Sequence, residues 1–512
     1  MNPLLILAVG VAIVLGLILV LRINAFIALV CAAIAVSILA PGATGEKMTR
    51  VAAAFGETAG AIGIVIALAA VVGKCMMDSG AADRIVRALL SMLGEKRAAA
   101  ALTTSGFVLS IPVFFDTAFY LLVPLARSTY RRTNRHYLKF LMAIAAGGVV
   151  THTLVPPTPG PLFVANQLGV DVGMMMLMGV VIGIPAAAVG LLYGRWLDRR
   201  MPIEMRPIGG GTEEPAPLAT GKLPGLMISL APILLPILLI TSNSFIKVAG
   251  YTALAKEPSI LTDTPAARFV NDGRLGVATT TADGESRFSA LTDGEITEAL
   301  FAAAENDLVI ARVFEWSNIF GNPNFALLIS AAIAVLTFHV QRRPGKKKMA
   351  ATIESALMSG GVIILITAAG GAFGAMLKAA KIGEAISQLF GDALVSGVPL
   401  LLFAFFMASL IKFAQGSSTS AMIVASGMIA AMVTPESFGF HPVYLATAIG
   451  SGSIVGSWMN DSGFWIFSKM GGLTEVESLK SWTPLLALIG VTSMIVTVAL
   501  AIVLPLTSVA AQ

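Results

Sequence analysis

The chain has 512 residues, of which 56% are hydrophobic and only 12% charged, and its formal net charge is +5. Because soluble domains contain about 25% charged residues, this composition excludes an ordinary soluble protein. The small positive charge gives no sign of a nucleic-acid surface. The two cysteines, Cys31 and Cys75, lie in apolar segments and indicate no disulfide framework. The chain also lacks GxxxxGK[ST], HExxH and CxxC motifs, which argues against an ATP-driven pump or a metalloenzyme. We expect no catalytic site, no metal and no cofactor.

Apolar runs recur along almost the whole chain, each about as long as a helix that crosses a hydrocarbon core of about 30 Å. The first run, NPLLILAVGVAIVLGLILVL, has no basic region ahead of it, so we interpret it as a retained helix and not as a signal peptide. The pattern predicts an all-α polytopic membrane protein with about ten transmembrane helices. Its first partner is therefore the lipid bilayer.

Basic residues cluster in short loops, which are expected to face the cytoplasm. These loops are 127–139, 195–206 and 341–348. The number of apolar runs between these loops returns the chain to the same side of the membrane each time. In this orientation both chain termini are external. The segment 244–318 contains 6 Lys/Arg and 11 Asp/Glu, so we predict that it is an external insertion. Within it, residues 296–314 have a helix-like pattern.

Asp116 is the one charged residue in the segment 98–126, and both flanks of that segment are basic. A single crossing cannot begin and end on the same side, and a straight helix of this length would measure about 43 Å, too long for the bilayer. Pro112 favours a break near the middle. We therefore predict a re-entrant hairpin with its tip at 111–117; the alternative is a pair of short spans with a capped Asp.

The two halves of the chain resemble each other when they are shifted by about 301 residues, a repeat of the kind found in transporters. Gly60 then falls on Gly361 and Gly73 on Gly374. The pattern places amphipathic surface helices at 81–96 and 382–395, and a second hairpin at 397–434 whose flanks lack basic residues. The hairpins thus have opposite orientations, which predicts an inverted repeat. The predicted units are a first repeat (1–206), a cytoplasmic linker (207–223), a helix that opens the second repeat (224–243), the external insertion (244–318) and the remainder of the second repeat (319–512).

Each hairpin is followed by a long helix with breakers at mid-depth. In the first half the breakers are the prolines of 145–162, and in the second half the polar residues and glycines of 448–465. The shift places Pro159 opposite Asn460, so the two breaks are equivalent. Two hairpin tips and two broken helices would then converge, and their helix N-termini suit a carboxylate substrate. The glycine pairs at 147–148 and 370–371 are expected to permit close helix contacts.

Ionisable residues at predicted mid-depth are few, and such residues are functional by default because an uncompensated charge there is costly. They are Asp116, His152, Lys412 and Asp461. Asp116 or Asp461 could carry a proton, whereas Lys412 could balance an anionic substrate or form a structural pair with either Asp. His152 could equally be an interhelical hydrogen-bonder.

Polar residues at the second hairpin and the second break have the composition wanted for binding hydroxyls or a carboxylate, although those of the hairpin could simply cap its helices. The predicted substrate-binding set is His152, Thr153, Gln415, Gly416, Ser417, Ser418, Thr419, Asn460, Asp461 and Ser462. Proton coupling is assigned to Asp116 and Asp461, and charge balance to Lys412.

Five motifs, in this order, resemble the gluconate permease family within the ion transporter superfamily. They are IPVFFD (111–116), LVPPTPGP (154–161), FGNPNFALLI (320–329), AQGSSTS (414–420) and NDSGFW (460–465). The resemblance implies uptake of a sugar acid such as gluconate by proton symport across the bacterial inner membrane, by a homodimer with an elevator motion. Two departures are the size of segment 244–318 and Thr158, where the family more usually has His.

Two kinds of alternative function are open at this stage. Within the transporter class, the chain could be a sodium-coupled carrier of a dicarboxylate or a small amino acid. Outside that class it could be a membrane enzyme or a channel, although no GxSG motif supports a hydrolase.

Overall fold

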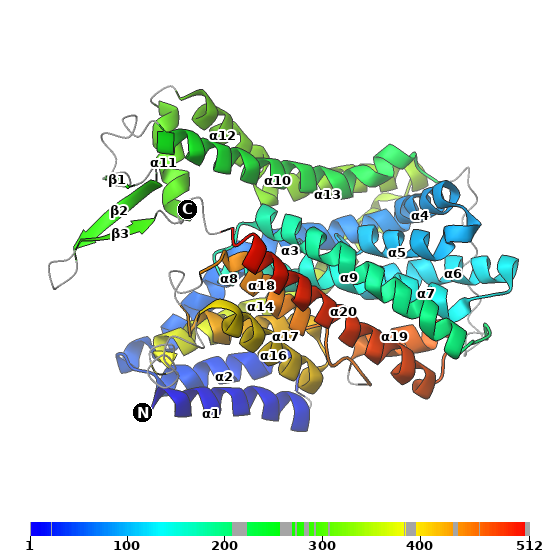
Figure 1. The fold of residues 1–512 in the computed structure, drawn as a ribbon, viewed down its shortest axis with the longest axis horizontal. Coiled ribbons are helices and arrows are strands. Elements are labelled where there is room, and N and C mark those ends of the chain that lie inside the picture. Colours follow the sequence, from blue (N-terminus) through cyan, green and yellow to red (C-terminus); the bar gives the residue numbers. More distant parts are fainter. Residues whose placement is uncertain are drawn as a thin grey trace.

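The computed structural model describes most of the chain as helices that pack along one another (Figure 1). The described residues are 2–21, 23–206, 223–256, 269–271, 274–280, 286–290, 293–305, 308–382, 385, 396–433, 439–459 and 461–506. Within this part, eight helices are long and apolar enough to cross a membrane. Buried side chains are mostly Ala, Leu, Ile, Val, Phe and Met, as expected where helices bury apolar faces against each other.

Within the described residues, the first half of the chain forms nine α-helices. They are α1 (Pro3–Leu15), α2 (Ala25–Leu39), α3 (Lys47–Ser79), α4 (Ala81–Leu93), α5 (Ala98–Leu109), α6 (Phe115–Thr133), α7 (Tyr137–Leu154), α8 (Pro159–Gln167) and α9 (Val172–Arg200). α3 ends at Ser79 and is followed by the C-cap Gly80, which has a left-handed φ of +86° that glycine adopts without strain. α4 follows directly, and its Ala81, Ile85 and Val86 are buried.

The second half repeats this order of helices. They are α10 (Leu226–Lys256), α13 (Pro323–Arg342), α14 (Lys346–Ala379), α16 (Gly397–Gln415), α17 (Ser418–Ala430), α18 (Pro442–Gly452), α19 (Ser462–Gly471) and α20 (Glu475–Val503). α2 and α13, which correspond in this order, both begin after an asparagine whose side chain caps the helix, Asn24 and Asn322. The predicted counterpart of α4, at 382–395, lies almost entirely outside the described residues.

Contacts between the halves are reciprocal. α3 packs on α14 and α9 packs on α20, and each of these pairs joins corresponding helices. α2 contacts α14 as α13 contacts α3, and α8 contacts α17 as α19 contacts α6. Exchange of this kind is what an approximate two-fold relation between two units produces. It also places a hairpin of each half against the broken helix of the other.

Both predicted hairpins are interrupted helices. The first consists of α5 and α6, with a break at 110–114 that includes Pro112, and α5 packs on α6. The second consists of α16 and α17, which also pack together and meet at Gly416 and Ser417. Both predicted broken helices are interrupted too, between α7 and α8 and between α18 and α19. The four breaks expected from the sequence are therefore present.

The glycine pairs have the expected role. A Cβ added at Gly147 in α7 would lie 2.0 Å from the backbone oxygen of Thr103 in α5. A Cβ added at Gly370 in α14 would lie 1.8 Å from a side-chain carbon of Ile423, and one added at Gly371 would lie 2.0 Å from the hydroxyl of Thr58. Because real Cβ atoms do not approach other atoms so closely, these contacts require glycine.

The segment after residue 243 differs from the prediction. α10 continues to Lys256, so the predicted helix boundary at 243 is wrong, and the helix-like stretch 296–314 is divided between α11 (Asp293–Glu305) and α12 (Val309–Phe320). The segment also contains a small antiparallel sheet, which was not expected in an all-helical chain. Its strands are, in order, β1 (Phe269–Asn271), β2 (Arg274–Thr280) and β3 (Ser286–Ala290). Figure 1 shows this sheet beside α11, away from the main bundle. α11 and α12 are held by packing on the end of α10, where Tyr251 and Leu254 are buried.

Candidate functional site

Four helices begin at the breaks, and they differ in how their first N–H groups are satisfied. Asp461 caps α19 by accepting a hydrogen bond from the Gly463 N–H at 3.0 Å, and Ser417 caps α17 by accepting one from the Ser420 N–H at 3.2 Å. α6 and α8 have no side-chain cap. The residues before them, Phe114 and Thr158, line one small cavity together with Pro112, Pro157 and Pro159. These N-termini therefore contribute partial positive charge next to a cavity.

A buried ion pair joins the second hairpin to the second broken helix. Lys412 in α16 is 1% exposed, and its Nζ lies 2.7 Å from Oδ2 of Asp461, whose side chain is 12% exposed. Lys412 Nζ also donates to the backbone oxygen of Gly416, and Ser457 Oγ donates to the same Oδ2 of Asp461. Each charge is thus compensated by a partner and by further hydrogen bonds, as a buried pair requires. Of the two acidic residues that the sequence offered, it is Asp461 that pairs with Lys412.

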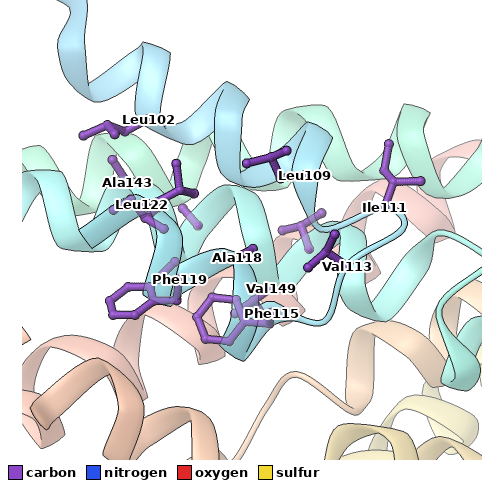
Figure 2. Close-up of a cluster of buried hydrophobic side chains, with 14 of the residues drawn as sticks. Leu102, Leu109, Ile111, Val113, Phe115, Ala118, Phe119, Leu122, Ala143 and Val149 are labelled. Atoms are coloured by element: carbon purple, nitrogen blue, oxygen red, sulfur yellow. The ribbon is translucent and has the colours of Figure 1, made fainter. Parts of the chain in front are cut away.

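Asp116 lies in the first turn of α6, half-buried, and within the described residues it makes no hydrogen bond or ion pair. It is nevertheless close enough to Lys412 and Asp461 to interact with their charges. The hairpin around it is held by apolar contacts: Figure 2 shows Phe115 and Phe119 pointing to the same side of α6, with Ile111 and Val113 at the tip. Asp116 therefore stands on a hairpin packed by apolar side chains and has no bonded partner among the described residues.

His152 and Gln415 both carry buried polar atoms that lack partners among the described residues. These atoms are Nδ1 of His152 and both Nε2 and Oε1 of Gln415. The imidazole contacts the ring of Phe114 edge-on, with 6.1 Å between ring centroids, and it is close enough to Lys412 and Asp461 to interact with their charges. Buried polar groups are usually hydrogen-bonded, because an unsatisfied one costs about 1–3 kcal/mol. The two side chains therefore have bonding capacity that a ligand or water can use.

The tip of the second hairpin is polar and partly accessible. Gly416 has a left-handed φ of +83°, which lets the chain turn between α16 and α17. Ser417 is exposed, Thr419 is half-buried, and Ser418 Oγ donates to the backbone oxygen of Ser453 at 2.8 Å. This last bond ties the hairpin tip to the break after α18.

The remaining residues of the predicted substrate-binding set differ in their exposure and in their free bonding capacity. Ser462 is exposed at the start of α19, close to Asp461, whereas Asn460 lies outside the described residues. Thr153 is 1% exposed, and its hydroxyl donates to the backbone oxygen of Val149 at 2.9 Å. A hydroxyl that donates within its own helix has less to offer a ligand. Thr153 also contacts Gly450, where a Cβ would lie 2.8 Å from the Thr153 backbone oxygen.

Two residues of this network were missed in the sequence. Ser457 lies in the break after α18 and contacts Asp461, and Trp482 in α20 donates from its Nε1 to Ser457 Oγ at 2.6 Å. Ser457 stands four residues before Asp461, a spacing that could have drawn attention to it. Nothing in the local sequence distinguishes Trp482 from an apolar core residue.

Comparisons with known proteins agree with the resemblance seen in the motifs. A family model described as "GntP family permease" matches residues 2–262 and 297–503, and the unmatched residues 263–296 include β1–β3. A low-affinity gluconate transporter of Escherichia coli is 29% identical over 96% of this chain and 96% of its own. A protein of Haemophilus influenzae named "uncharacterized permease" is 31% identical over 93% of this chain and 87% of its own. In fold, the YdaH transporter of Alcanivorax borkumensis, whose topology is described as unusual, matches 99% of both chains with a TM-score of 0.58 and 11% identity.

Proposed function

This chain belongs to the GntP permease family, and we propose that it takes up gluconate or a related hydroxylated monocarboxylate together with a proton. It is a multi-pass membrane protein, and it is a transporter and not an enzyme. The resemblance noted from the motifs is confirmed by the family match. The substrate and the coupling ion belong to our proposal.

The observation that carries the proposal is the group of unpartnered polar atoms around a buried cation. Nδ1 of His152 and the amide of Gln415 have no partners within the described residues, and Lys412 lies three positions before Gln415. A substrate with one carboxylate and several hydroxyls supplies what these groups lack, since hydroxyls both donate and accept. In the proposal, the carboxylate lies near Lys412 and the uncapped N-termini of α6 and α8, and the hydroxyls bind the hairpin tip.

We assign the coupling proton to Asp116 in preference to Asp461. Asp461 accepts from Lys412, Ser457 and Gly463, so protonation would break a network of charge-assisted bonds. Asp116 has no donor among the described residues. A proton there breaks no hydrogen bond or ion pair within that part of the chain, which suits a site that is protonated on one side of a membrane and deprotonated on the other.

For the transport cycle we propose an elevator motion of an inverted repeat, in a homodimer of the inner membrane. Its support is the reciprocal packing of the two halves, together with the charge interactions that link Asp116 of the first hairpin and His152 of the first broken helix to the ion pair. The face of α14 lined by Leu357, Met358, Val362 and Leu365 is exposed and apolar, and we place the contact with a second copy there.

Purified protein in proteoliposomes tests the function directly. We expect labelled gluconate to accumulate when an inward proton gradient is imposed and no sodium is present. Uptake that follows a sodium gradient and ignores pH would replace proton coupling by sodium coupling. If the protein takes up a dicarboxylate or an amino acid and no sugar acid, the proposed substrate class is wrong. Counterflow, the exchange of external label for internal unlabelled substrate, should also occur, and a wild-type protein that shows none with a confirmed substrate is not a carrier.

A further inference from the structure

Trp482 occupies the point where the two halves of the candidate site meet. It stands in α20, is 1% exposed, and its ring lies 5.4 Å from that of Phe115 and 5.2 Å from that of Phe467, measured between centroids. Phe115 directly precedes Asp116, and Phe467 belongs to α19, the helix that Asp461 caps. One side chain thus contacts both the first hairpin and the second broken helix.

The indole also fixes the direction of a hydrogen-bond chain. Its Nε1–H can only donate, and it donates to Ser457 Oγ at 2.6 Å. The Ser457 hydroxyl, fully buried, therefore accepts from Trp482 and donates its own hydrogen to Oδ2 of Asp461. The same oxygen receives Lys412 Nζ at 2.7 Å. The donors thus run from Trp482 through Ser457 to Asp461, and Lys412 donates to the same carboxylate oxygen from the other side.

We propose that Ser457 and Trp482 are positioning residues, which hold the carboxylate of Asp461, and through it the ammonium of Lys412, at the site for the anionic substrate. The contact of the same indole with Phe115 ties this orientation to the hairpin that carries Asp116. The inference rests on the proposed function to the extent that Lys412 is at the substrate site. A side chain that acts through another in this way typically changes affinity or activity by about 10- to 100-fold when it is removed, as outer-shell partners of metal ligands do.

The hydrogen-bond chain is tested first without any substrate, by thermal unfolding of purified variants. Trp482→Phe keeps an aromatic ring and loses the N–H, and Ser457→Ala interrupts the next link. We expect Trp482→Phe to lower the melting temperature of the wild type, and to lower that of the Ser457→Ala protein by less than half as much, because the link is already broken. Partners in one network are coupled in this way, whereas independent packing losses add. Full additivity of the two shifts would overturn the proposal.

Trp465→Phe is the matched control for this cycle. Its Nε1 donates to the backbone oxygen of Met459 at 2.8 Å and has no bond to Ser457. Its shift should therefore add to that of Ser457→Ala. A coupling as large as that of Trp482 would show that the non-additivity is not specific to the chain, and would count against the proposal.

Uptake kinetics then test the positioning role in transport. In proteoliposomes, Ser457→Ala and Trp482→Phe should each raise the KM for gluconate by about tenfold or more. Their effect on the maximal rate should be smaller. Ser457→Thr keeps the hydroxyl, so its KM should stay close to that of the wild type. Trp196→Phe, an exposed ring of α9, should have wild-type kinetics. Equal losses in Ser457→Thr and Ser457→Ala, or losses in maximal rate alone, would reject positioning. If the wild type itself transports no sugar acid, the proposed function fails, and the thermal cycle still decides whether Trp482 acts through Ser457.

Discussion

Asp116 is the residue whose environment separates it most clearly from the other charges in the bundle. Lys412 and Asp461 neutralise each other at 2.7 Å, whereas Asp116 has no bonded partner in the described part of the chain. We predict that Asp116→Asn abolishes accumulation against a gradient, because the amide cannot carry a proton, while expression and exchange of substrate across the membrane persist. Uptake driven by an imposed pH gradient and counterflow in the same vesicles measure the two activities. Accumulation that survives the substitution would remove Asp116 from the coupling role.

The ion pair gives a second prediction at this scale. Lys412→Met leaves the carboxylate of Asp461 with Ser457 and Gly463 as its donors within the described residues. Breaking a buried pair by removing one partner costs about 3–5 kcal/mol, and we expect the low end because the Asp461 side chain is still 12% exposed. The double variant with Asp461→Asn should recover part of this loss, since no uncompensated charge remains. Thermal unfolding of both purified proteins measures the difference, and a double variant less stable than Lys412→Met alone would contradict it.

The charged residues of the site could be found in the sequence, but their pairing could not. Ionisable residues are rare in apolar runs and are easily recognised there. The sequence therefore identified Asp116, His152, Lys412 and Asp461. Which acid pairs with Lys412 depends on how hairpins far apart in the chain meet, and the sequence left both possibilities open. Trp482 could not be identified, because a tryptophan in an apolar helix is typical of a core residue. The role of its N–H becomes apparent in the structure, where it donates to Ser457.

At the scale of elements, the hairpins and broken helices could be predicted because their causes are local. Prolines and polar runs favour helix breaks, and all four interruptions appear where such residues stand, although single prolines such as Pro185 and Pro484 lie inside helices. The fold of the predicted insertion was harder to anticipate. Asp272–Gly273 and Asp283–Gly284 are pairs of the kind that favour hairpin turns, and they stand between β1 and β2 and between β2 and β3. The short strands around them lack strong apolar alternation, so a small sheet gave little signal. The extension of α10 to Lys256 depends on its packing with α11 and α12, which a sequence does not show.

The contact between α5 and α7 allows a prediction about the rigidity of the first hairpin. Gly147→Ala would place a Cβ 2.0 Å from the Thr103 backbone oxygen and 2.8 Å from the Phe107 nitrogen, so the helices must separate. We expect a loss of about 1–3 kcal/mol, the usual cost of overpacking. Gly60→Ala is the matched control, because Gly60 is also helical but exposed, with nothing within 4 Å of an added Cβ. That change should be neutral or stabilising by up to about 1 kcal/mol. Melting temperatures of the two purified variants compare them, and equal shifts would show that close packing at Gly147 is unimportant.

At the scale of the whole molecule, the reciprocal contacts between halves give the site its composition. Because α8 packs on α17 and α6 packs on α19, each break lies beside an element of the other half. A site built in this way has two equivalent faces, one formed by each hairpin. If the halves are oppositely oriented in the membrane, the faces open to opposite sides, which is the geometric basis for alternating access. The direction of each half relative to the membrane is therefore the property on which the proposed mechanism depends.

That direction can be measured at the first residues of the two hairpins. Lys96 precedes α5 and Ser396 precedes α16, which are corresponding positions in the repeated order of helices. We predict that a cysteine at Lys96 reacts with a membrane-impermeant maleimide only after cells are permeabilised, because basic loops such as the one around it are expected to face the cytoplasm. A cysteine at Ser396, in a region without basic residues, should react in intact cells. The background replaces Cys31 and Cys75 by alanine, and cysteines at Glu298 and Lys347, both exposed, serve as external and cytoplasmic references. If positions 96 and 396 react from the same side of the membrane while the references behave as expected, the halves are parallel, and the proposed transport cycle cannot operate.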